Sequence, residues 1–230
     1  MQAIAAYGEA LTRAPDYVAA HTSKGTGLLS LGELRAALSD HAGAEAAYTQ
    51  AIAAYGEALT RAPEFVVAHM SKGNALLRLG DLRAALDDPA GAESAYCAAI
   101  AAYGEALTRA PDYVNAHINK GSALSSVGDL HVTLGDPARA ESAYLAAIAA
   151  TNEALRHAPN QVIALGNQGE ILRKLADLER QRGNESAACP RLREAKSLLD
   201  RALTLAPNHP EIAAESARVA DLLRSHCPPP

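Results

Sequence analysis

The sequence predicts an all-α protein, an α-solenoid built from stacked antiparallel helix hairpins. Three observations support this fold class. The segment IAAYGEALTRAP at residues 4–15 returns letter for letter at 52–63 and 100–111, and a degraded copy, IAATNEALRHAP, begins at residue 148. Apolar residues recur in steps of three and four twice within each 48-residue period, as they do on helices. A proline ends every copy. A period of this length is typical of stacked units that cannot bury their apolar faces alone.

Each period contains two helical patterns. Small or apolar positions of the first helix are Val18, His21, Gly25, Leu28, Leu31, Leu34 and Leu38. Those of the second helix are Ala44, Tyr48, Ala51, Ile52, Tyr55, Ala58 and Leu59. Because such spacing places side chains on one side of a helix, both helices are predicted to be amphipathic. We call them the first and the second helix of a repeat.

The ends of these helices are marked by capping residues and prolines. Short breaks separate the two helices of a repeat, reading SDHAG, DDPAG and GDPAR in successive copies. Asp88 before Pro89, and Asp136 before Pro137, predict an N-cap followed by proline at the first helical position. Since proline cannot continue a helix, each second helix should end near Pro15, Pro63, Pro111 or Pro159.

This register divides the chain into a single solenoid over residues 1–230. Residues 1–15 form a partial repeat with a second helix only. Four repeats follow at 16–63, 64–111, 112–159 and 160–207, the last of them divergent, with ERQRGNESAACPR in its turn. An amphipathic capping helix is expected at 208–225, with Ile212, Val219, Leu222 and Leu223 on its apolar side. The tail at 226–230, which ends in PPP, is expected to be extended and disordered.

Composition excludes several classes of protein. The chain has 49% apolar and 20% charged residues, as soluble packed proteins do, but only 4% aromatic residues. Its net charge of −5 and the lack of a Lys/Arg block exclude a nucleic-acid binder. No run of residues approaches a membrane span, and the N-terminus lacks a basic segment before an apolar core. We therefore expect a cytoplasmic protein without membrane partners.

The cysteines suggest no cross-link. Cys97, Cys189 and Cys227 are odd in number and widely spaced, and none forms a CxxC pair. Neither a disulfide framework nor a zinc site is indicated by this pattern. Reduced, mostly structural thiols are expected.

The register resembles the tetratricopeptide repeat family, whose units are normally 34 residues long. The pattern of that family's first helix is matched by His21, Lys24, Gly25 and Leu28, and again by His69, Lys72, Gly73, Leu76, His117, Lys120, Gly121 and Leu124. Its second-helix pattern is matched by Ala51, Tyr55, Pro63, Ala99, Tyr103, Pro111, Ala147 and Pro159. The resemblance implies a right-handed superhelix. Here histidine replaces the family's tryptophan, lysine replaces a leucine, and each unit is 14 residues longer.

The extra residues lie between Leu34 and Tyr48, where the hairpin turns. Shared between two helices at 3.6 residues per turn, they would add roughly two turns to each arm. Continued apolar spacing at Leu38 and Ala44 favours these longer arms. The alternative is a flexible inserted loop.

No catalytic or metal-binding chemistry is predicted. His21, His69 and His117 occupy equivalent turns, but zinc would need their nitrogens about 2.0–2.1 Å from one ion, whereas packed helix axes lie about 8–10 Å apart. We expect these histidines to pack in or near the core. The sequence contains no GxSxG, HExxH or phosphate-binding glycine loop. We therefore expect neither enzyme activity nor a cofactor.

Gly8, Gly56 and Gly104 lie in the middle of the repeated second helix. A glycine there costs about 1 kcal/mol of helix stability relative to alanine. Either something approaches the backbone closely at these positions, or the verbatim repeats copy one ancestral choice. Copying is the interpretation that we favour.

The resemblance implies a function as well. In tetratricopeptide proteins, the first helices line a concave face that commonly holds a segment of a partner protein. The chain is thus expected to be a non-catalytic scaffold for a protein or peptide ligand. The candidate contact residues on that face are Thr22, Thr26, Met70, Asn74, Arg78, Asn115, Ile118, Asn119, Ser122, Asn167, Glu170 and Lys174.

The family's chaperone-binding members grip a terminal carboxylate with lysines and asparagines on successive first helices. Thr22, Met70, Ile118 and Gly166 stand at the lysine positions here, and only Asn74 matches an asparagine. A carboxylate clamp is therefore not predicted.

Two alternatives remain open for the function. Residues 2–14 carry an apolar stripe with no first helix before it, so copies of the chain could associate through this segment as a structural or self-assembling array. The chain could also be a fragment of a longer array of the same repeats.

Overall fold

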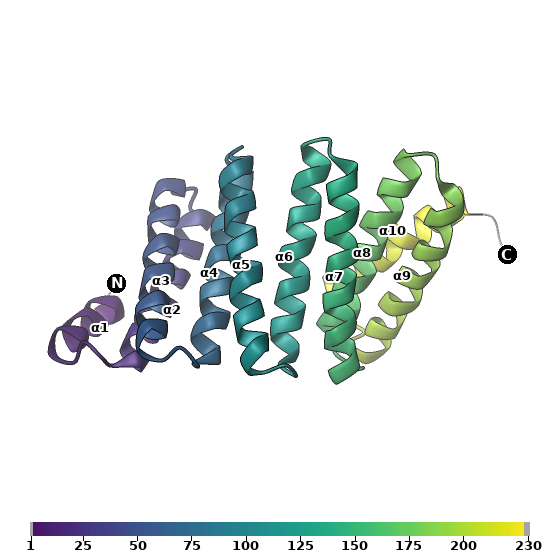
Figure 1. Cartoon of the computed structure of the whole chain (residues 1–230). Coiled ribbons are helices and arrows are strands. Elements are labelled where there is room, and N and C mark those ends of the chain that lie inside the picture. Colours follow the sequence, from purple (N-terminus) through teal and green to yellow (C-terminus); the bar gives the residue numbers. More distant parts are fainter. Residues whose placement is uncertain (1, 228–230) are drawn as a thin grey trace. The chain divides into compact units, whose positions relative to one another are not determined.

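The computed structural model describes residues 2–227, which form ten α-helices and no β-strand (Figure 1). The helices are α1 (Gln2–Arg13), α2 (Val18–Ala37), α3 (His41–Arg61), α4 (Val66–Ala85), α5 (Pro89–Arg109), α6 (Val114–Thr133), α7 (Pro137–His157), α8 (Val162–Gln181), α9 (Glu185–Leu205) and α10 (Pro210–His226). The all-α prediction is confirmed. The PPP tail lies outside the described residues.

Consecutive helices pack as antiparallel hairpins, α2 with α3, α4 with α5, α6 with α7 and α8 with α9. Contacts divide the chain into two compact units, which meet in sequence between Pro111 and Asp112. Unit 1 contains α1–α5 and unit 2 contains α6–α10. In each unit the second helix of one hairpin packs on the first helix of the next, so the predicted stacking of hairpins is confirmed.

The 14 extra residues of each repeat lengthen the helices. Only residues 38–40 separate α2 from α3, so the alternative of a flexible inserted loop is wrong. The short turn places one residue in the left-handed region, where Ser39 and Asp87 have a φ of 60° and the later copies have Gly135 and Gly183. Glycine adopts this conformation without steric cost.

Capping follows the predicted pattern. The Asp88 carboxylate accepts a hydrogen bond from Gly91 N at 2.9 Å, and Asp136 accepts one from Arg139 N at 3.1 Å. Pro89 and Pro137 occupy the first helical turn. A backbone N–H has no partner within the helix there, so its absence in proline costs no hydrogen bond. Asp40 caps α3 in the same way, with Gly43 N at 3.0 Å. These caps fix where each second helix begins.

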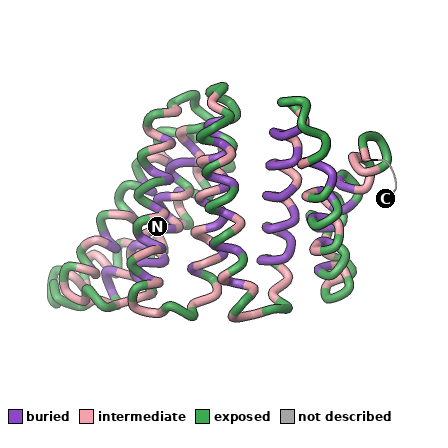
Figure 2. Tube along the Cα trace, turned by 45° about the vertical axis from the view of Figure 1, so that its right-hand side comes forward, coloured by how far each residue is buried: buried purple, intermediate pink, exposed green. Residues whose placement is uncertain are grey.

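Tyrosine rings packed on glycines bring the two helices of a hairpin together. A Cβ atom placed on Gly25 would lie 2.7 Å from Tyr55, and one on Gly73 would lie 2.5 Å from Tyr103. Both rings are 0% exposed. Further pairs of this kind are Gly32–Tyr48, Gly80–Tyr96 and Gly128–Tyr144. Buried residues follow these packed faces along the hairpins (Figure 2). A core with few aromatic residues is thereby filled by rings resting directly on helix backbone.

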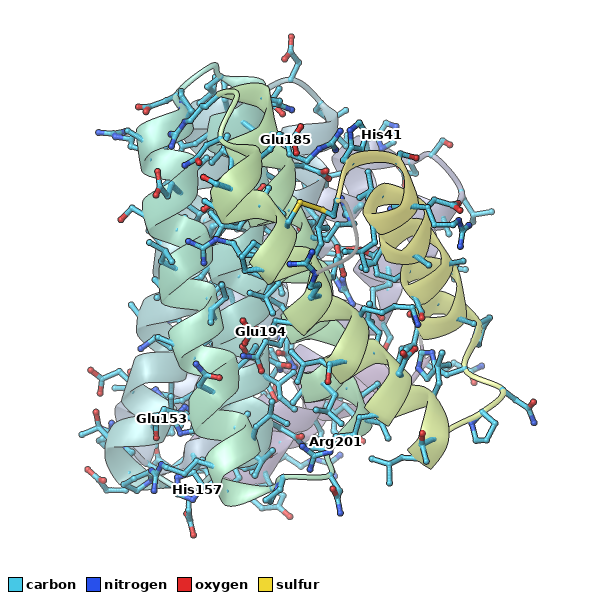
Figure 3. The ribbon with its side chains drawn as sticks, turned by 90° about the vertical axis from the view of Figure 1, so that its right-hand side faces the viewer. His41, Glu153, His157, Glu185, Glu194 and Arg201 are labelled. Atoms are coloured by element: carbon cyan, nitrogen blue, oxygen red, sulfur yellow. A yellow bond between two sulfur atoms is a disulfide. The ribbon has the colours of Figure 1, made fainter. Side chains whose placement is uncertain are left out.

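Arginines near the ends of second helices connect one hairpin to the loop before it. Arg61 pairs with Asp16 at 3.1 Å, and Arg109 pairs with Glu64 at 3.2 Å. Near the end of α9, Arg201, which is labelled in Figure 3, donates to the Pro159 carbonyl at 2.8 Å. Exposed ion pairs contribute about 0–1 kcal/mol each. Their main effect is therefore on the register between hairpins.

The last repeat departs from the predicted turn. The sequence ERQRGNESAACPR was expected to form this turn, but the structure limits it to residues 182–184 and begins α9 at Glu185, with Pro190 inside the helix. Early helix formation buries Ala188 and Leu192, which are both 0% exposed. The free energy gained by burying these side chains outweighs the loss of the one backbone hydrogen bond that the proline cannot donate.

Helix α10, which was predicted to cap the solenoid, packs on α8 and α9. Ile212 and Val219 are buried against a cluster that includes Leu165, Leu172 and Leu192. Glu215 of α10 pairs with Arg173 of α8, and each side chain is 12% exposed. The helix extends to His226, one residue beyond its predicted end.

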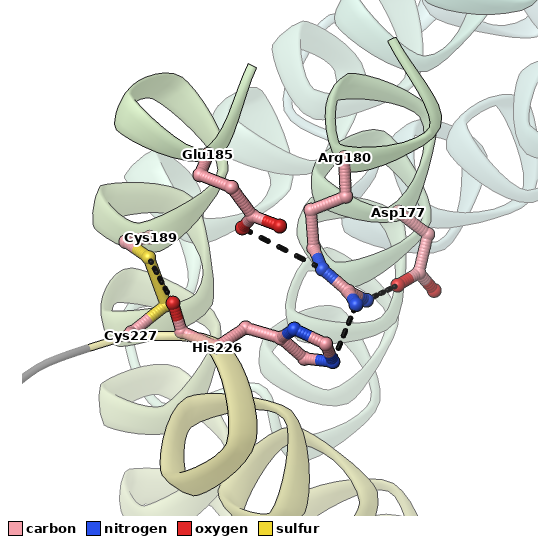
Figure 4. Close-up of a disulfide and its surroundings, with 6 residues drawn as sticks. All are labelled: Asp177, Arg180, Glu185, Cys189, His226 and Cys227. Atoms are coloured by element: carbon pink, nitrogen blue, oxygen red, sulfur yellow. Dashed lines mark hydrogen bonds and ion pairs between the residues drawn. A yellow bond between two sulfur atoms is a disulfide. The ribbon is translucent and has the colours of Figure 1, made fainter. Parts of the chain in front are cut away.

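A disulfide joins Cys189 of α9 to Cys227, the residue after α10 (Figure 4). The expectation of reduced thiols is wrong for these two cysteines, and Cys97 remains free and exposed. The two cysteines are 38 residues apart in the sequence, and no local motif marks them as a pair. Only the packing of α10 along α9 brings the two sulfurs together.

The periodic histidines have packing roles, as predicted. His21 Nε2 is bonded to the Pro15 carbonyl and His69 Nε2 to the Pro63 carbonyl, each at 2.8 Å. Both residues are at least nine-tenths buried. His117 stacks on His157 with ring centroids 5.8 Å apart. Among the described residues, no three His, Cys, Asp or Glu side chains are grouped to hold a metal ion.

Within the described part of the chain, no helix combines the length and hydropathy that crossing a bilayer requires.

Because its tyrosines are packed in the core, we expect the protein to unfold at alkaline pH. Burial raises the pKa of Tyr48, Tyr55, Tyr103 and Tyr144 above the usual 10.0. Their unfolded forms release protons near pH 10 while the folded forms still hold them, so stability is retained below pH 10 and falls as the pH rises further. We expect tyrosinate absorbance from these rings to appear together with loss of helical circular dichroism. Complete ionisation of all tyrosines in a still helical protein would contradict this packing.

Candidate binding surface

The twelve candidate residues lie on the first helices of the hairpins, α2 and α4 in unit 1, and α6 and α8 in unit 2. We call the surface that these helices present the first-helix surface, and describe it separately for each unit. In unit 2, α6 and α8 contact one another directly. Candidate residues of two successive repeats are thereby brought together.

A hydroxyl and an amide join α6 to α8. Asn167 Nδ2 donates to Ser122 Oγ at 3.1 Å, and the Ser122 hydroxyl donates to the Ile118 carbonyl at 3.2 Å. Both side chains line a cavity of about 170 Å³ together with Ser125, Ser126, Asp129, Glu170, Ile171 and Lys174. All of the lining residues except Ile171 are polar or charged, and their groups can exchange partners with a bound segment.

Lys174 also lines this cavity. Its Nζ is 2.8 Å from an Asp129 oxygen, 2.9 Å from a Glu170 oxygen and 3.3 Å from Ser125 Oγ. Burial lowers the pKa of Lys174, but the Asp129 and Glu170 carboxylates raise it more, so the net shift is upward. The ammonium therefore stays charged, and its charge is neutralised within the protein.

A second cavity of about 280 Å³ continues along α6 and α8 beside Asp129. Tyr144 of α7 donates its hydroxyl proton to Asp129 at 2.7 Å. Burial raises the pKa of Tyr144, and its hydrogen bond to the Asp129 carboxylate adds to that rise. The phenol is thus a fixed donor, which orients Asp129 toward Lys174.

In unit 1 four of the candidates are engaged by other residues of the same unit, and Arg78 reaches the preceding hairpin. Asn74 Oδ1 accepts a hydrogen bond from the Tyr103 hydroxyl at 2.8 Å. Thr26 lies 3.2 Å from the Tyr55 hydroxyl, and Thr22 donates to the Val18 carbonyl at 2.9 Å. Arg78 pairs with Glu33 and with Asp81, each at 3.4 Å. Of these residues, Thr26 and Arg78 are the exposed ones.

Two candidates are buried. Met70 is 6% and Ile118 is 5% exposed, so both contribute to packing and offer almost no surface to a ligand. Ile118 packs against Ala154 and Ala164 inside unit 2. Asn115 is exposed and Asn119 is half-buried, both on α6.

Sequence reasoning missed Asp129 and Ser125, which complete the Lys174 cluster. A periodic signal for the acids exists, because Glu33, Asp81, Asp129 and Asp177 are 48 residues apart. Cations follow 45 residues later at two of the three junctions, where Arg78 meets Glu33 and Lys174 meets Asp129. Reading acids and cations in one register would have predicted both ion pairs.

This chemistry suits hydrogen bonding to a polar segment. In unit 2 the cavity holds the carboxylates of Asp129 and Glu170 against the single ammonium of Lys174. A ligand carboxylate would meet no unneutralised cation there. The arrangement agrees with the sequence argument against a carboxylate clamp.

Comparison with known proteins adds a family assignment. The sequence profile described as tetratricopeptide repeat matches residues 29–93 and 128–190, which is more than half of the chain. No curated protein matches the sequence.

Solved structures share the architecture at low sequence identity. A thermophilic protein of this repeat class from Thermus thermophilus superposes with a TM-score of 0.54 at 19% identity, covering 95% of this chain and 89% of its own. BtubC from P. vanneervenii gives a TM-score of 0.54 at 13% identity, covering 100% of this chain and 91% of its own. At these identities the similarity establishes the fold alone.

Proposed function

Because the chain belongs to the tetratricopeptide repeat family, we propose that it is a non-catalytic scaffold which binds a protein or peptide segment on its first-helix surface. The observation that carries this proposal is the polar cavity between α6 and α8. Its hydroxyl, amide and ion-paired groups come from two successive hairpins. A ligand held there would contact both repeats.

The ligand is proposed to be an extended or helical segment with polar side chains. Ser122, Asn167 and Ser126 present hydroxyl and amide groups, which donate and accept hydrogen bonds. Specificity would arise because a ligand that fails to satisfy these half-buried groups leaves them without partners. We assign no chemical reaction to this surface.

A charged substitution on this surface tests the proposal. Ser122→Arg places a long cation in the α6–α8 cavity and should reduce capture of the partner at least about tenfold, since it blocks the site and disturbs its charge balance. Ala149→Arg, at an exposed position on α7, is the matched control. Both proteins would be crosslinked in lysate, and the captured proteins quantified by mass spectrometry.

Equal capture by the two variants would reject this surface as the binding site. Asn74 is a poor position for such a test, although the sequence suggested it. Its bond to Tyr103 means that a substitution would disturb the hairpin as well as the surface.

The cytoplasmic location stays a prediction. Disulfides such as Cys189–Cys227 are more typical of oxidising compartments. Labelling of free thiols in cells lysed directly into denaturant and alkylating agent would decide between the two, because a chain from a reducing compartment is expected to present three reactive cysteines and an oxidised one only Cys97.

A further inference from the structure

A row of polar contacts leads from the Cys189–Cys227 disulfide to the end of α8 (Figure 4). His226, the residue before Cys227, accepts a hydrogen bond from Arg180 at 2.5 Å. Arg180 pairs in turn with Asp177 at 3.3 Å. Both α8 side chains are at most 30% exposed, so water screens their charges only in part. The bond that holds Cys227 in place therefore also holds His226 on Arg180.

The same row continues to the wall of a cavity. Asp177 accepts a second hydrogen bond, from Arg173 at 2.6 Å. Arg173 also pairs with Glu215 of α10 and is 12% exposed. Arg173 and Asp177 line the cavity of about 280 Å³ on the first-helix surface, together with Asp129 and Lys174. The Asp177 carboxylate thus connects the disulfide end of unit 2 to the candidate binding surface.

Arg180 has an alternative partner within reach. Its Nε is buried and donates no hydrogen bond to a described residue, and an oxygen of Glu185 lies 3.7 Å from it. A buried N–H without a partner destabilises the state that contains it. Once His226 moves away, the guanidinium therefore gains by turning toward Glu185 and away from Asp177. Asp177 would then be held by Arg173 alone, and its position at the cavity would change.

Thiol–disulfide exchange with a dithiol reductant supplies this movement. Cys189 is buried and Cys227 is half-buried, so an attacking thiolate reaches the Cys227 sulfur more easily. The sulfur–sulfur bond breaks, and Cys189 leaves as a thiolate that takes up a proton. The second thiol of the reductant then displaces Cys227, so that two electrons and two protons pass to the protein and the reductant becomes a disulfide. The reverse exchange with an oxidised dithiol restores the bond.

We propose that the Cys189–Cys227 disulfide is a redox switch that regulates binding at the first-helix surface of unit 2. This inference rests on the proposed function, because it concerns the same surface. In the oxidised form, His226 holds Arg180 on Asp177, and the cavity wall is fixed. In the reduced form, the last turn of α10 opens and Arg180 leaves Asp177. A segment that fits the fixed wall binds the oxidised form more tightly, since only contacts that differ between two states can shift their populations.

The expected regulation is moderate. Ile212 and Val219 are buried against α8 and α9 and keep most of α10 in place after reduction. The contacts that rearrange are partly exposed ion pairs, so the affinities of the two forms are expected to differ about threefold to fivefold.

Nuclear magnetic resonance of the arginine side chains tests the switch without a ligand. The Nε–H signals of Arg173 and Arg180 in the full chain are assigned by single substitutions to lysine. Reduction with dithiothreitol should shift both signals, because both guanidinium groups share the Asp177 carboxylate. An unchanged Arg173 signal after complete reduction would overturn the proposal, because the disulfide would then hold only the end of α10.

Two substitutions in the last turn of α10 separate the switch from general stability. His226→Ala keeps the disulfide and removes the contact with Arg180, so the oxidised variant should already show the Arg173 signal of the reduced protein. Ser225→Ala is the matched control, since the Ser225 hydroxyl is bonded to a carbonyl of its own helix at 2.9 Å. The control should respond to reduction as the wild type does. A wild-type Arg173 signal in oxidised His226→Ala would contradict the path through His226.

Partner capture tests the regulation itself. The probe is the protein whose capture from lysate Ser122→Arg reduces. At limiting concentration, the oxidised wild type should capture about three to five times more of it than the wild type in dithiothreitol. Cys227→Ser should capture the smaller amount in both conditions, which excludes an effect of the reductant on the partner. Cys97→Ser should respond as the wild type does, because Cys97 is free.

The regulation and the binding site fail on different results. Equal capture by oxidised and reduced wild type, in an assay that Ser122→Arg still blocks, would overturn the switch and leave the proposed function standing. Equal capture by Ser122→Arg and Ala149→Arg would overturn the binding site, and its regulation with it.

Discussion

Replacing Gly73 by alanine is expected to destabilise the protein by about 1–3 kcal/mol, the usual cost of overpacking a well-filled core. The added methyl would lie 2.5 Å from Cε1 of Tyr103. That ring is 0% exposed, and its hydroxyl is bonded to Asn74, so it cannot move aside without breaking other contacts. Helix propensity acts in the opposite direction, since alanine is favoured over glycine by up to about 1 kcal/mol. The net loss therefore measures the steric clash after this gain has been subtracted.

Gly104→Ala is the matched control for this prediction. Gly104 is adjacent to Tyr103 on the same helix, but a Cβ there meets no described atom within 4 Å. This variant should be more stable than the wild type by up to about 1 kcal/mol. Urea denaturation followed by circular dichroism would compare the two free energies of unfolding. Equal stabilisation by both alanines would mean that the tyrosine does not rest on Gly73.

Reduction of the Cys189–Cys227 disulfide is expected to lower the free energy of unfolding of unit 2 by up to about 4 kcal/mol. This value follows from the chain entropy that a closed loop of 38 residues removes from the unfolded state. The bond ties the end of α10 to the beginning of α9, where His226 also contacts Arg180 at 2.5 Å (Figure 4). Buried Ile212 and Val219 hold the rest of α10 without it. Opening the bond should therefore loosen the last turn of α10 first.

Thermal unfolding with and without reductant measures this effect. Cys227→Ser should lower the melting temperature and should be insensitive to reductant. Cys97→Ser should behave as the wild type in both conditions, because Cys97 is free. Native chains should contain one titratable thiol. A reductant-induced shift that persists in Cys227→Ser would show that the stabilisation has another source.

Local patterns in the sequence were sufficient to predict the helices. The caps at Asp88 and Asp136, the prolines after the second helices and the spacing of apolar residues act over a few neighbouring residues. The 48-residue period then implied that the hairpins stack, because identical units bury identical faces. Pro190 is the exception. Its local preference for a turn is overruled by burial of Ala188 and Leu192, which depends on helices far away in the sequence.

The candidate binding surface was only partly predictable. Ser122, Asn167, Glu170 and Lys174 meet between α6 and α8 as expected from residues on successive first helices. The burial of Met70 and Ile118 was not predicted, since hydrophobic residues at a boundary between two faces can turn either way. Asp129 belongs to this cluster because the Lys174 ammonium and the Tyr144 hydroxyl both donate hydrogen bonds to its carboxylate. Neither contact can be read from the sequence around Asp129.

By itself the sequence determined the helical hairpins, their order and the family, because each depends on repeated short-range patterns. Tertiary structure alone decided which cysteines pair, which glycines lie under tyrosine rings and which, such as Gly56 and Gly104, have no atom within 4 Å of an added Cβ. Gly25, Gly56 and Gly73 are indistinguishable as letters. Their difference arises from which neighbouring helix approaches each backbone, and that distance exists only after the hairpins have packed.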